Sequence, residues 1–164
     1  MDLDKLSLFE SIKSSFLHID AHEKALLTRH NITLPRFFTL LHVYNNPGIN
    51  QMDLTALMLC TKGNITRILQ GMEVEKLVER SENPEDGRST LVNITESGQA
   101  LLFKIYKDYE GLISELMGKF TPEQLKKYSQ DLNCIENTLN PKAPETAMKT
   151  GKHTLVLKRE DVVN

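Results

Sequence analysis

Several features that would assign this sequence to a secreted protein, a membrane protein or a metalloprotein are scarce or missing. The chain of 164 residues has two cysteines, Cys60 and Cys134, which lie far apart and match no metal-ligand spacing. Its apolar runs are much shorter than the roughly 20 residues that a membrane span needs. Its first residues are acidic and amphipathic, unlike a signal peptide. We therefore expect one cytoplasmic domain with two free thiols, a regulatory thiol pair being the alternative.

Motifs for catalysis and cofactor binding are also absent. The sequence contains no phosphate-binding glycine loop, no HExxH zinc motif and no nucleophile elbow. The run NPEDGRSTLVN is not a calcium loop, because Glu82, Pro84 and Asn93 would occupy its first, third and twelfth positions. His18 and His22 share a helix face at a possible ligand spacing, but a pair of solvated histidines is the simpler explanation. We predict no enzyme activity, no cofactor and no metal.

The net charge of −2 argues mildly against a nucleic-acid partner. The charge is unevenly distributed, however. Between Thr33 and Met72 the basic residues are Arg36, Lys62 and Arg67 and the only acid is Asp53, so this segment carries 3 − 1 = +2. An acid-poor segment is what a DNA-facing surface requires.

Apolar residues at steps of three and four predict a long first helix through Leu6, Phe9, Ile12, Phe16 and Ile19, ending near Asn31. Thr33 is expected to cap a second helix, which has Pro35 in its first turn and stops before Asn45-Asn46-Pro47-Gly48. Asn50 can cap a short third helix, whose apolar side would be Met52, Leu54, Leu57 and Met58.

The second half of the chain predicts a fourth helix, a hairpin and two more helices. Thr61 can cap the fourth helix, VERSE and LVNI alternate like short strands, and Thr95 can cap a long helix that continues to Leu116. A last helix starts at Thr121-Pro122-Glu123, and Leu125, Tyr128, Leu132, Ile135 and Leu139 form an apolar seam that needs another helix. The fold class is therefore mainly α with a small β-hairpin, an α+β winged helix-turn-helix with long terminal helices.

The fourth helix has the composition of a recognition helix. Ile65, Ile68, Leu69 and Met72 cluster on its core side. Its opposite face carries Gly63, Arg67 and Gln70, with Asn64 and Thr66 at the edges and Lys62 in the first turn. Arginine can pair with guanine, and asparagine or glutamine with adenine, in the major groove. An ordinary solvated helix face would have a similar composition.

The hairpin tip carries one arginine beside one aspartate. Asp86-Gly87 makes the turn, and Arg88 follows it. A guanidinium on such a tip suits the negative potential of the minor groove, with Asp86 holding it extended. The alternative is a surface ion pair worth about 0–1 kcal/mol and without function.

The run from Ile65 to Gly98 resembles the signature of the MarR family of winged-helix transcriptional regulators. The residues that carry the resemblance are Ile65-Thr66-Arg67, Met72-Glu73, Leu77-Val78-Glu79-Arg80, Asp86-Gly87-Arg88 and Ile94-Thr95-Glu96-Ser97-Gly98. The helix order extends it over roughly residues 5–140. One departure is Lys76, which stands where a glycine is often found before Leu-Val.

The resemblance implies a homodimeric repressor that binds a pseudo-palindromic double-stranded DNA operator. Residues 1–140 would form one domain, with dimerisation helices at about 5–30 and 95–140 and a DNA-binding lobe at about 33–94. The expected DNA-binding residues are Thr61, Lys62, Gly63, Asn64, Thr66, Arg67, Gln70, Arg88 and Ser89, with Asp86 orienting Arg88.

Many family members release DNA when a small aromatic ligand enters a crevice between the two parts. Phe16, Phe37, Phe38, His42 and Tyr106 are the candidates to line such a crevice here, although all but His42 suit a plain core equally well. Other members sense oxidants through a cysteine near the first helix, where this chain has none. Cys60, next to the cap of the fourth helix, is either an oxidation reporter or a small buried residue.

Two questions stay open at the level of sequence. A winged-helix module that binds protein rather than DNA is the alternative function, and it would be expected to expose apolar residues in the segment 33–72. The tail at 141–164 is either an arm that clasps the dimer, since HTLVLK alternates like a strand, or disordered.

Overall fold

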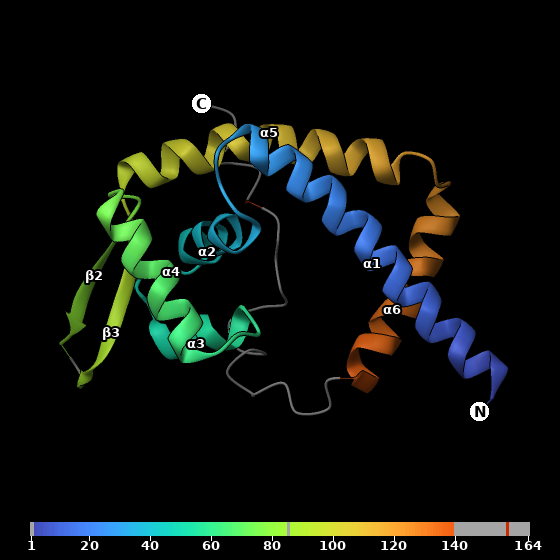
Figure 1. Ribbon diagram of the computed structural model, residues 1–164, viewed down its shortest axis with the longest axis horizontal. Helices are drawn as coiled ribbons and strands as arrows, with labels where there is room; N and C mark the ends of the chain where they lie inside the picture. Colours follow the sequence, from blue (N-terminus) through green and yellow to red (C-terminus); the bar gives the residue numbers. More distant parts are fainter. Residues whose placement is uncertain (1, 85, 140–156, 158–164) are drawn as a thin grey trace.

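The described part of the chain is mostly helical. The computed structural model describes residues 2–84, 86–139 and 157, and for residues 86–88 it describes the backbone alone. Its elements are α1 (Leu3–Arg29), α2 (Leu34–Asn45), β1 (Ile49–Asn50), α3 (Gln51–Leu57), α4 (Lys62–Val74), β2 (Val78–Asn83), β3 (Asp86–Ile94), α5 (Glu96–Met117) and α6 (Pro122–Leu139). The hairpin of β2 and β3 is the wing. Figure 1 shows α5 running from this wing to α6, with α2, α3 and α4 gathered beneath the first half of α5.

All four predicted cap residues directly precede a helix, and three of them make the capping hydrogen bond. The side chains of Asn50, Thr61 and Thr95 each accept a hydrogen bond from the main-chain N–H three residues on, at 2.8, 3.3 and 3.0 Å. These bonds satisfy N–H groups that the first turn of a helix leaves unpaired. Thr33 occupies the cap position of α2, but its hydroxyl makes no such bond, so that part of the prediction is wrong.

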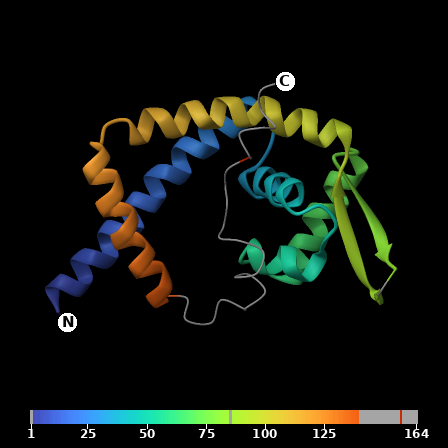
Figure 2. The same ribbon diagram turned by 180° about the vertical axis from the view of Figure 1, so that it is seen from behind.

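The sheet has one strand more than the sequence predicted. β3 pairs with β2 and, on its other edge, with the two-residue strand β1, all antiparallel. Ile49 lies opposite Val92, and the main-chain N–H of Gly48 donates to Asn93 Oδ1 at 2.8 Å. β1 directly precedes α3, so this pairing ties the helix-turn-helix to the wing, which projects from one side of the molecule in Figure 2.

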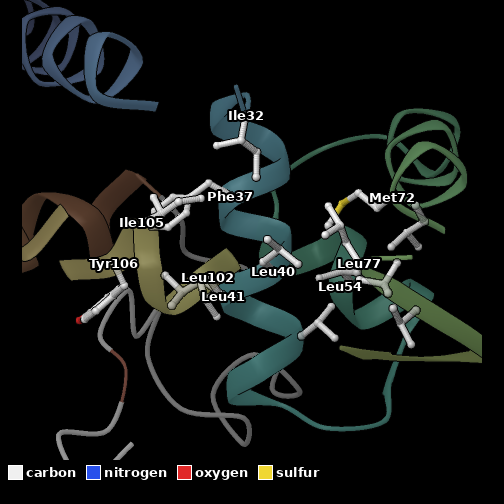
Figure 3. Packing of buried hydrophobic residues seen from close by; sticks show 14 of the residues in the cluster. Ile32, Phe37, Leu40, Leu41, Leu54, Met72, Leu77, Leu102, Ile105 and Tyr106 are labelled. Atoms are coloured by element: carbon white, nitrogen blue, oxygen red, sulfur yellow. The ribbon is translucent and has the colours of Figure 1, made fainter. Parts of the chain in front are cut away.

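α2 forms the centre of the apolar core. Figure 3 shows Phe37, Leu40 and Leu41 of α2 among side chains from α3, α4 and α5. Every one of these three residues is fully buried. On α3, Leu54 and Leu57 point into the core as predicted, but Met52 is 78% exposed, so its assignment to the apolar side was wrong. α3 is only seven residues long and therefore offers the core a narrow face.

α1 and α6 leave apolar side chains outside this core. Between Leu3 and Leu26 on α1 no side chain is fully buried, and α6 has no buried residue at all. α6 crosses α1 at the end away from the wing (Figure 1), and the two helices line a groove of about 400 Å³ formed by Leu8, Phe9, Ile12, Cys134, Ile135 and Leu139, among others. Within the described ranges, no helix combines the length and apolar character needed to span a membrane.

Candidate nucleic-acid interface

α4 is divided into a core side and an exposed side, as its sequence predicted. Ile65, Leu69 and Met72 are fully buried, and Ile68 is half-buried. Gly63, Arg67 and Gln70 are exposed, while Asn64 and Thr66 lie half-buried at the edges. Lys62 and Thr61 are exposed at the start of the helix, so every candidate on α4 reaches the surface at least in part.

Hydrogen bonds fix part of this exposed face. The Gln51 side chain donates to Thr66 Oγ1 at 2.7 Å, and Thr66 Oγ1 donates to the Lys62 carbonyl at 2.7 Å. Thr66 is therefore used to join α3 to α4, which reduces its capacity to read a base. Arg67 Nη2 donates to Asn64 Oδ1 at 3.4 Å, a long bond that leaves the other guanidinium N–H groups available for a ligand.

A hollow of about 660 Å³ separates the helix-turn-helix from the wing. The described residues that line it are Asn50, Gln51, Met52, Thr55, Lys62, Asn83, Ser89 and Thr90, and none of these is acidic. Asn83 Nδ2 donates to Ser89 Oγ at 2.9 Å across the two wing strands. Apart from Lys62 and Ser89, sequence reasoning missed these residues, because they come from segments far apart in the chain and share no motif.

The wing tip itself is only partly described. The backbone places Asp86, Gly87 and Arg88 at the start of β3, with Asp86 opposite Asn83. Where the side chains of Asp86 and Arg88 lie falls outside the described part of the structure. The predicted role of Asp86 in orienting Arg88 therefore stays a prediction.

The charge of the lobe is smaller than the count over residues 33–72 suggested. Arg36 Nη2 lies 2.5 Å from Glu75 Oε2, so the charge of this arginine is matched by an acid just beyond the counted segment. Glu73 likewise pairs with Arg80 of β2. Lys62 and Arg67 are thus the cations of the lobe that face outward from α4. A sequence count misses the Arg36 pair because its two residues are 39 positions apart.

Several residues of the predicted signature hold the lobe together rather than face outward. Lys76 adopts a left-handed backbone with a φ of 57°, which explains why glycine suits this position. Its carbonyl accepts hydrogen bonds from the hydroxyls of Thr95 and Ser97, both at 2.5 Å. Gly98 packs against the Leu77 carbonyl so closely that an added Cβ would lie 2.0 Å from its oxygen. These contacts fix the start of α5 against the end of α4.

The candidate ligand-binding residues do not all come together. Phe37 and Phe38 pack with Tyr109, at ring-centroid distances of 4.9 and 6.5 Å, and Tyr106 lies 6.4 Å from Tyr109. His42 is buried on α2. Phe16, by contrast, is 62% exposed on α1 and does not take part in this aromatic cluster. The structure of the single chain therefore does not place Phe16 in a crevice with the other four candidate residues.

Burial and hydrogen bonds perturb the acid–base behaviour of this cluster. Burial raises the pKa of Tyr106, and burial together with a hydrogen bond to Glu23 raises the pKa of Tyr109 strongly. Tyr109 Oη donates to Glu23 Oε1 at 2.5 Å, and burial raises the pKa of that carboxyl as well. Both phenols therefore stay protonated at neutral pH.

The cysteines and histidines form no metal site among the residues that the structure describes. No group of three or more potential ligands is found there, and His18 and His22 are both exposed. Cys60 is half-buried, and burial raises the pKa of its thiol, which lowers its nucleophilicity at neutral pH. Cys134 is exposed on α6 of the single chain.

The fold and the exposed face of α4 define a winged-helix protein, and comparisons with known proteins agree. A model of the MarR family matches residues 30–89. The organic hydroperoxide resistance transcriptional regulator of Bacillus subtilis is 33% identical over 119 residues, covering 73% of this chain and 80% of the relative. The chain therefore belongs to the MarR family of transcriptional regulators, which confirms the resemblance and the prediction that it is not an enzyme.

Solved structures share the same fold. A cysteine-to-serine mutant of MarR from Escherichia coli, complexed with operator DNA, superposes with a TM-score of 0.75 at 24% identity, covering 82% of this chain and 99% of that one. A MarR family regulator from Streptomyces coelicolor in complex with DNA gives a TM-score of 0.78 at 16% identity, covering 86% and 91%. At these identities the likeness establishes the winged-helix fold.

Proposed function

We propose that this protein is a cytoplasmic repressor that binds a pseudo-palindromic DNA operator as a homodimer. One observation carries the proposal: α4 exposes Lys62, Arg67 and Gln70, its other side is buried, and no acidic residue lies between 61 and 72. A helix of this kind can enter the major groove, where arginine pairs with guanine and glutamine with adenine. Two proteins of the same fold were solved in complex with DNA, which supports DNA as the ligand.

The wing and the hollow beside it would complete the interface. Lys62 and the hydroxyls of Ser89 and Thr90 line the hollow, and such groups commonly contact phosphate oxygens. Arg88 would read the shape of the minor groove, with Asp86 orienting it. Thr61, Gly63, Asn64 and Thr66 would sit closest to the DNA backbone or base edges along α4. Because phosphate contacts release counterions, affinity should fall steeply as salt concentration rises.

In the decisive experiment the full chain is mixed with a pool of random DNA sequences, and the molecules that it binds are isolated and sequenced. A two-fold symmetric site is expected, since two copies related by a dyad read two half-sites about one helical turn apart. In a gel shift at fixed salt, Arg67→Ala should weaken binding to this site by about 1–3 kcal/mol and relax the preference at one base pair. Lys107→Ala, which removes an exposed cation from α5, is the matched control and should bind normally.

Arg88→Ala tests the wing separately. It should weaken binding by about 1–3 kcal/mol without changing the preferred bases in the major groove, because its contribution is to shape readout. Unchanged binding would remove Arg88 from the interface but leave α4 in it. If selection yields no site and the chain is not retained on heparin at low salt, a winged-helix module that binds protein is the better reading.

Release of DNA by a small aromatic effector is the finer part of the proposal. Phe37, Phe38, His42 and Tyr106 lie where α2 of the lobe meets α5 of the dimerisation part, so a ligand wedged there could alter their relative position. Simple phenols and benzoates should then weaken the gel shift of the wild-type chain. Phe38→Leu, which replaces a half-buried aromatic ring with a smaller aliphatic side chain, should reduce that sensitivity; equal sensitivity would argue against this location.

A further inference from the structure

Leu157 is the one residue beyond Leu139 whose position the structure describes, and it is buried. Its side chain is 1% exposed and belongs to the same apolar cluster as Phe37 of α2 and Ile105 of α5. Leucine on its own is attracted to any apolar surface. A second, directional contact is needed before this position can be regarded as a binding site.

Tyr106 provides that directional contact. The main-chain N–H of Leu157 donates to Tyr106 Oη at 3.0 Å, although the two residues are 51 positions apart. Tyr106 is itself 1% exposed, so both partners are shielded from water. A buried main-chain N–H without an acceptor would oppose docking, because it loses its hydrogen bonds to water. The phenol oxygen removes this penalty at one defined point.

The docked residue adjoins the junction of three helices. Tyr106 lies 6.4 Å from Tyr109, ring centroid to ring centroid, and Tyr109 in turn contacts Phe37 of α2 and donates to Glu23 of α1. α1, α2 and α5 therefore meet at the aromatic cluster that Leu157 extends. Anything that holds Leu157 in place also adds apolar contacts at this junction.

We propose that the buried face of α5 at Tyr106 is an intramolecular docking site for the C-terminal segment of this chain, with Leu157 as its anchor. The site recognises an apolar side chain and a main-chain N–H presented together, which is the chemistry of a peptide segment. Docking adds to the packing between α5 and α2, and release of Leu157 loosens it. The site is independent of the DNA-binding face, because none of its residues lies on α4 or the wing.

Thiol accessibility tests the anchor. In a chain whose own cysteines are replaced (Cys60→Ser, Cys134→Ser), Leu157→Cys should react with a small neutral maleimide at least roughly tenfold more slowly than Val74→Cys in the same background. Val74 is the reference because it is 84% exposed on α4. Adding Tyr106→Phe, which keeps the ring and removes the acceptor, should speed modification at position 157 by roughly fivefold. Tyr128→Phe on α6 is the control and should have no effect.

The unaltered chain gives a second, independent measurement. Its Leu157 amide should exchange hydrogen at least roughly tenfold more slowly than an unprotected peptide amide. Equal maleimide rates at positions 157 and 74, or an unprotected Leu157 amide, would overturn the docking site. Protection that disappears on dilution would show that the segment comes from a second copy and would overturn the intramolecular contact. Neither measurement involves DNA, so the outcome is separate from that of the proposed function.

Discussion

Lys76 has a left-handed backbone at the point where α4 ends and the chain turns into β2. Its N–H donates to the Glu73 carbonyl at 2.9 Å, and the next N–H, of Leu77, donates to the Met72 carbonyl at 2.9 Å. This pair of bonds is the Schellman arrangement, in which glycine is the preferred residue at the left-handed position. Lysine can adopt the same turn, but in the left-handed conformation its Cβ lies too close to the backbone, which raises the free energy of the folded state.

We expect Lys76→Gly to raise the free energy of unfolding by about 0.5–1 kcal/mol, because relief of the left-handed strain exceeds the added entropy of the unfolded chain. Urea unfolding followed by circular dichroism measures the change. Lys107→Gly, in the interior of α5, is the control and should instead destabilise by about 1 kcal/mol. A destabilised Lys76→Gly chain would mean that the lysine side chain makes a compensating contact.

Gly98 illustrates a glycine required for space rather than for backbone freedom. Because an added Cβ would meet the Leu77 carbonyl oxygen at 2.0 Å, Gly98→Ala should lower the free energy of unfolding by about 1–3 kcal/mol. Gly71→Ala is the matched control: no atom lies within 4 Å of its added Cβ, and alanine favours the helix, so stability should rise by about 0.5–1 kcal/mol. Thermal unfolding of both variants against wild type decides whether the position next to Leu77 is sterically closed.

At the scale of elements, two polar contacts attach α1 to α5. Glu23 accepts the hydrogen bond from Tyr109, and His30 Nε2 lies 2.9 Å from Asp108 Oδ2. Burial raises the pKa of Glu23 above its ordinary value of 4.5, the hydrogen bond from Tyr109 opposes this shift, and the charge of Asp20 adds to it. The packing of α1 on α5 is therefore sensitive to the protonation of one carboxyl.

The raised pKa has a definite sign for stability. The folded chain keeps a proton on Glu23 in a range where the unfolded chain has lost it, so the stabilisation present below pH 4.5 is lost as pH rises through the folded pKa. Glu23→Gln should remove this part of the pH dependence. The difference in unfolding free energy between variant and wild type should therefore change across that range. Glu115→Gln, an exposed change on α5, is the control; a pH-independent difference for Glu23→Gln would contradict the prediction.

Elements defined by local signals could be predicted, and contacts between distant segments could not. The caps at Asn50, Thr61 and Thr95 and the two faces of α4 follow from residues within a few positions of each other. β1 was missed because two residues carry no periodicity, and Arg36–Glu75 because its partners are remote in sequence. Phe16 shows a further limit: helical spacing marks an apolar face but does not say whether the core or another chain covers it.

At the scale of the whole molecule, the apolar faces of α1 and α6 lack a cover within the described chain. Leu132 is 57% exposed on α6, and Phe9 and Leu139 are more exposed still. Apolar patches of this kind usually mark an interface between proteins. A second copy of the chain is the partner proposed here, because symmetric dimers are the commonest way to bury such a self-complementary face.

Leu132→Asp should convert the proposed dimer to a monomer, since the interface would then contain an unpaired charge. Val74→Asp, an equally drastic change at an exposed position of α4, is the control and should leave the dimer intact. Analytical ultracentrifugation of both variants measures the mass. A dimeric Leu132→Asp chain with normal circular dichroism would exclude this part of α6 from the interface.

The distance along the chain between α1 and its partner has a consequence for biosynthesis. Glu23 and Tyr109 are 86 positions apart, so most of the lobe must leave the ribosome before α1 can dock on α5. Until then Leu26 and Leu27 of α1, which are buried in the folded chain, lack the part of their cover that α5 supplies, and exposed apolar segments of nascent chains are prone to aggregate. The cap residue Asp2 and the charged residues Asp4, Lys5, Glu10 and Lys13 of α1 keep this end of the helix hydrated before α5 has been synthesised.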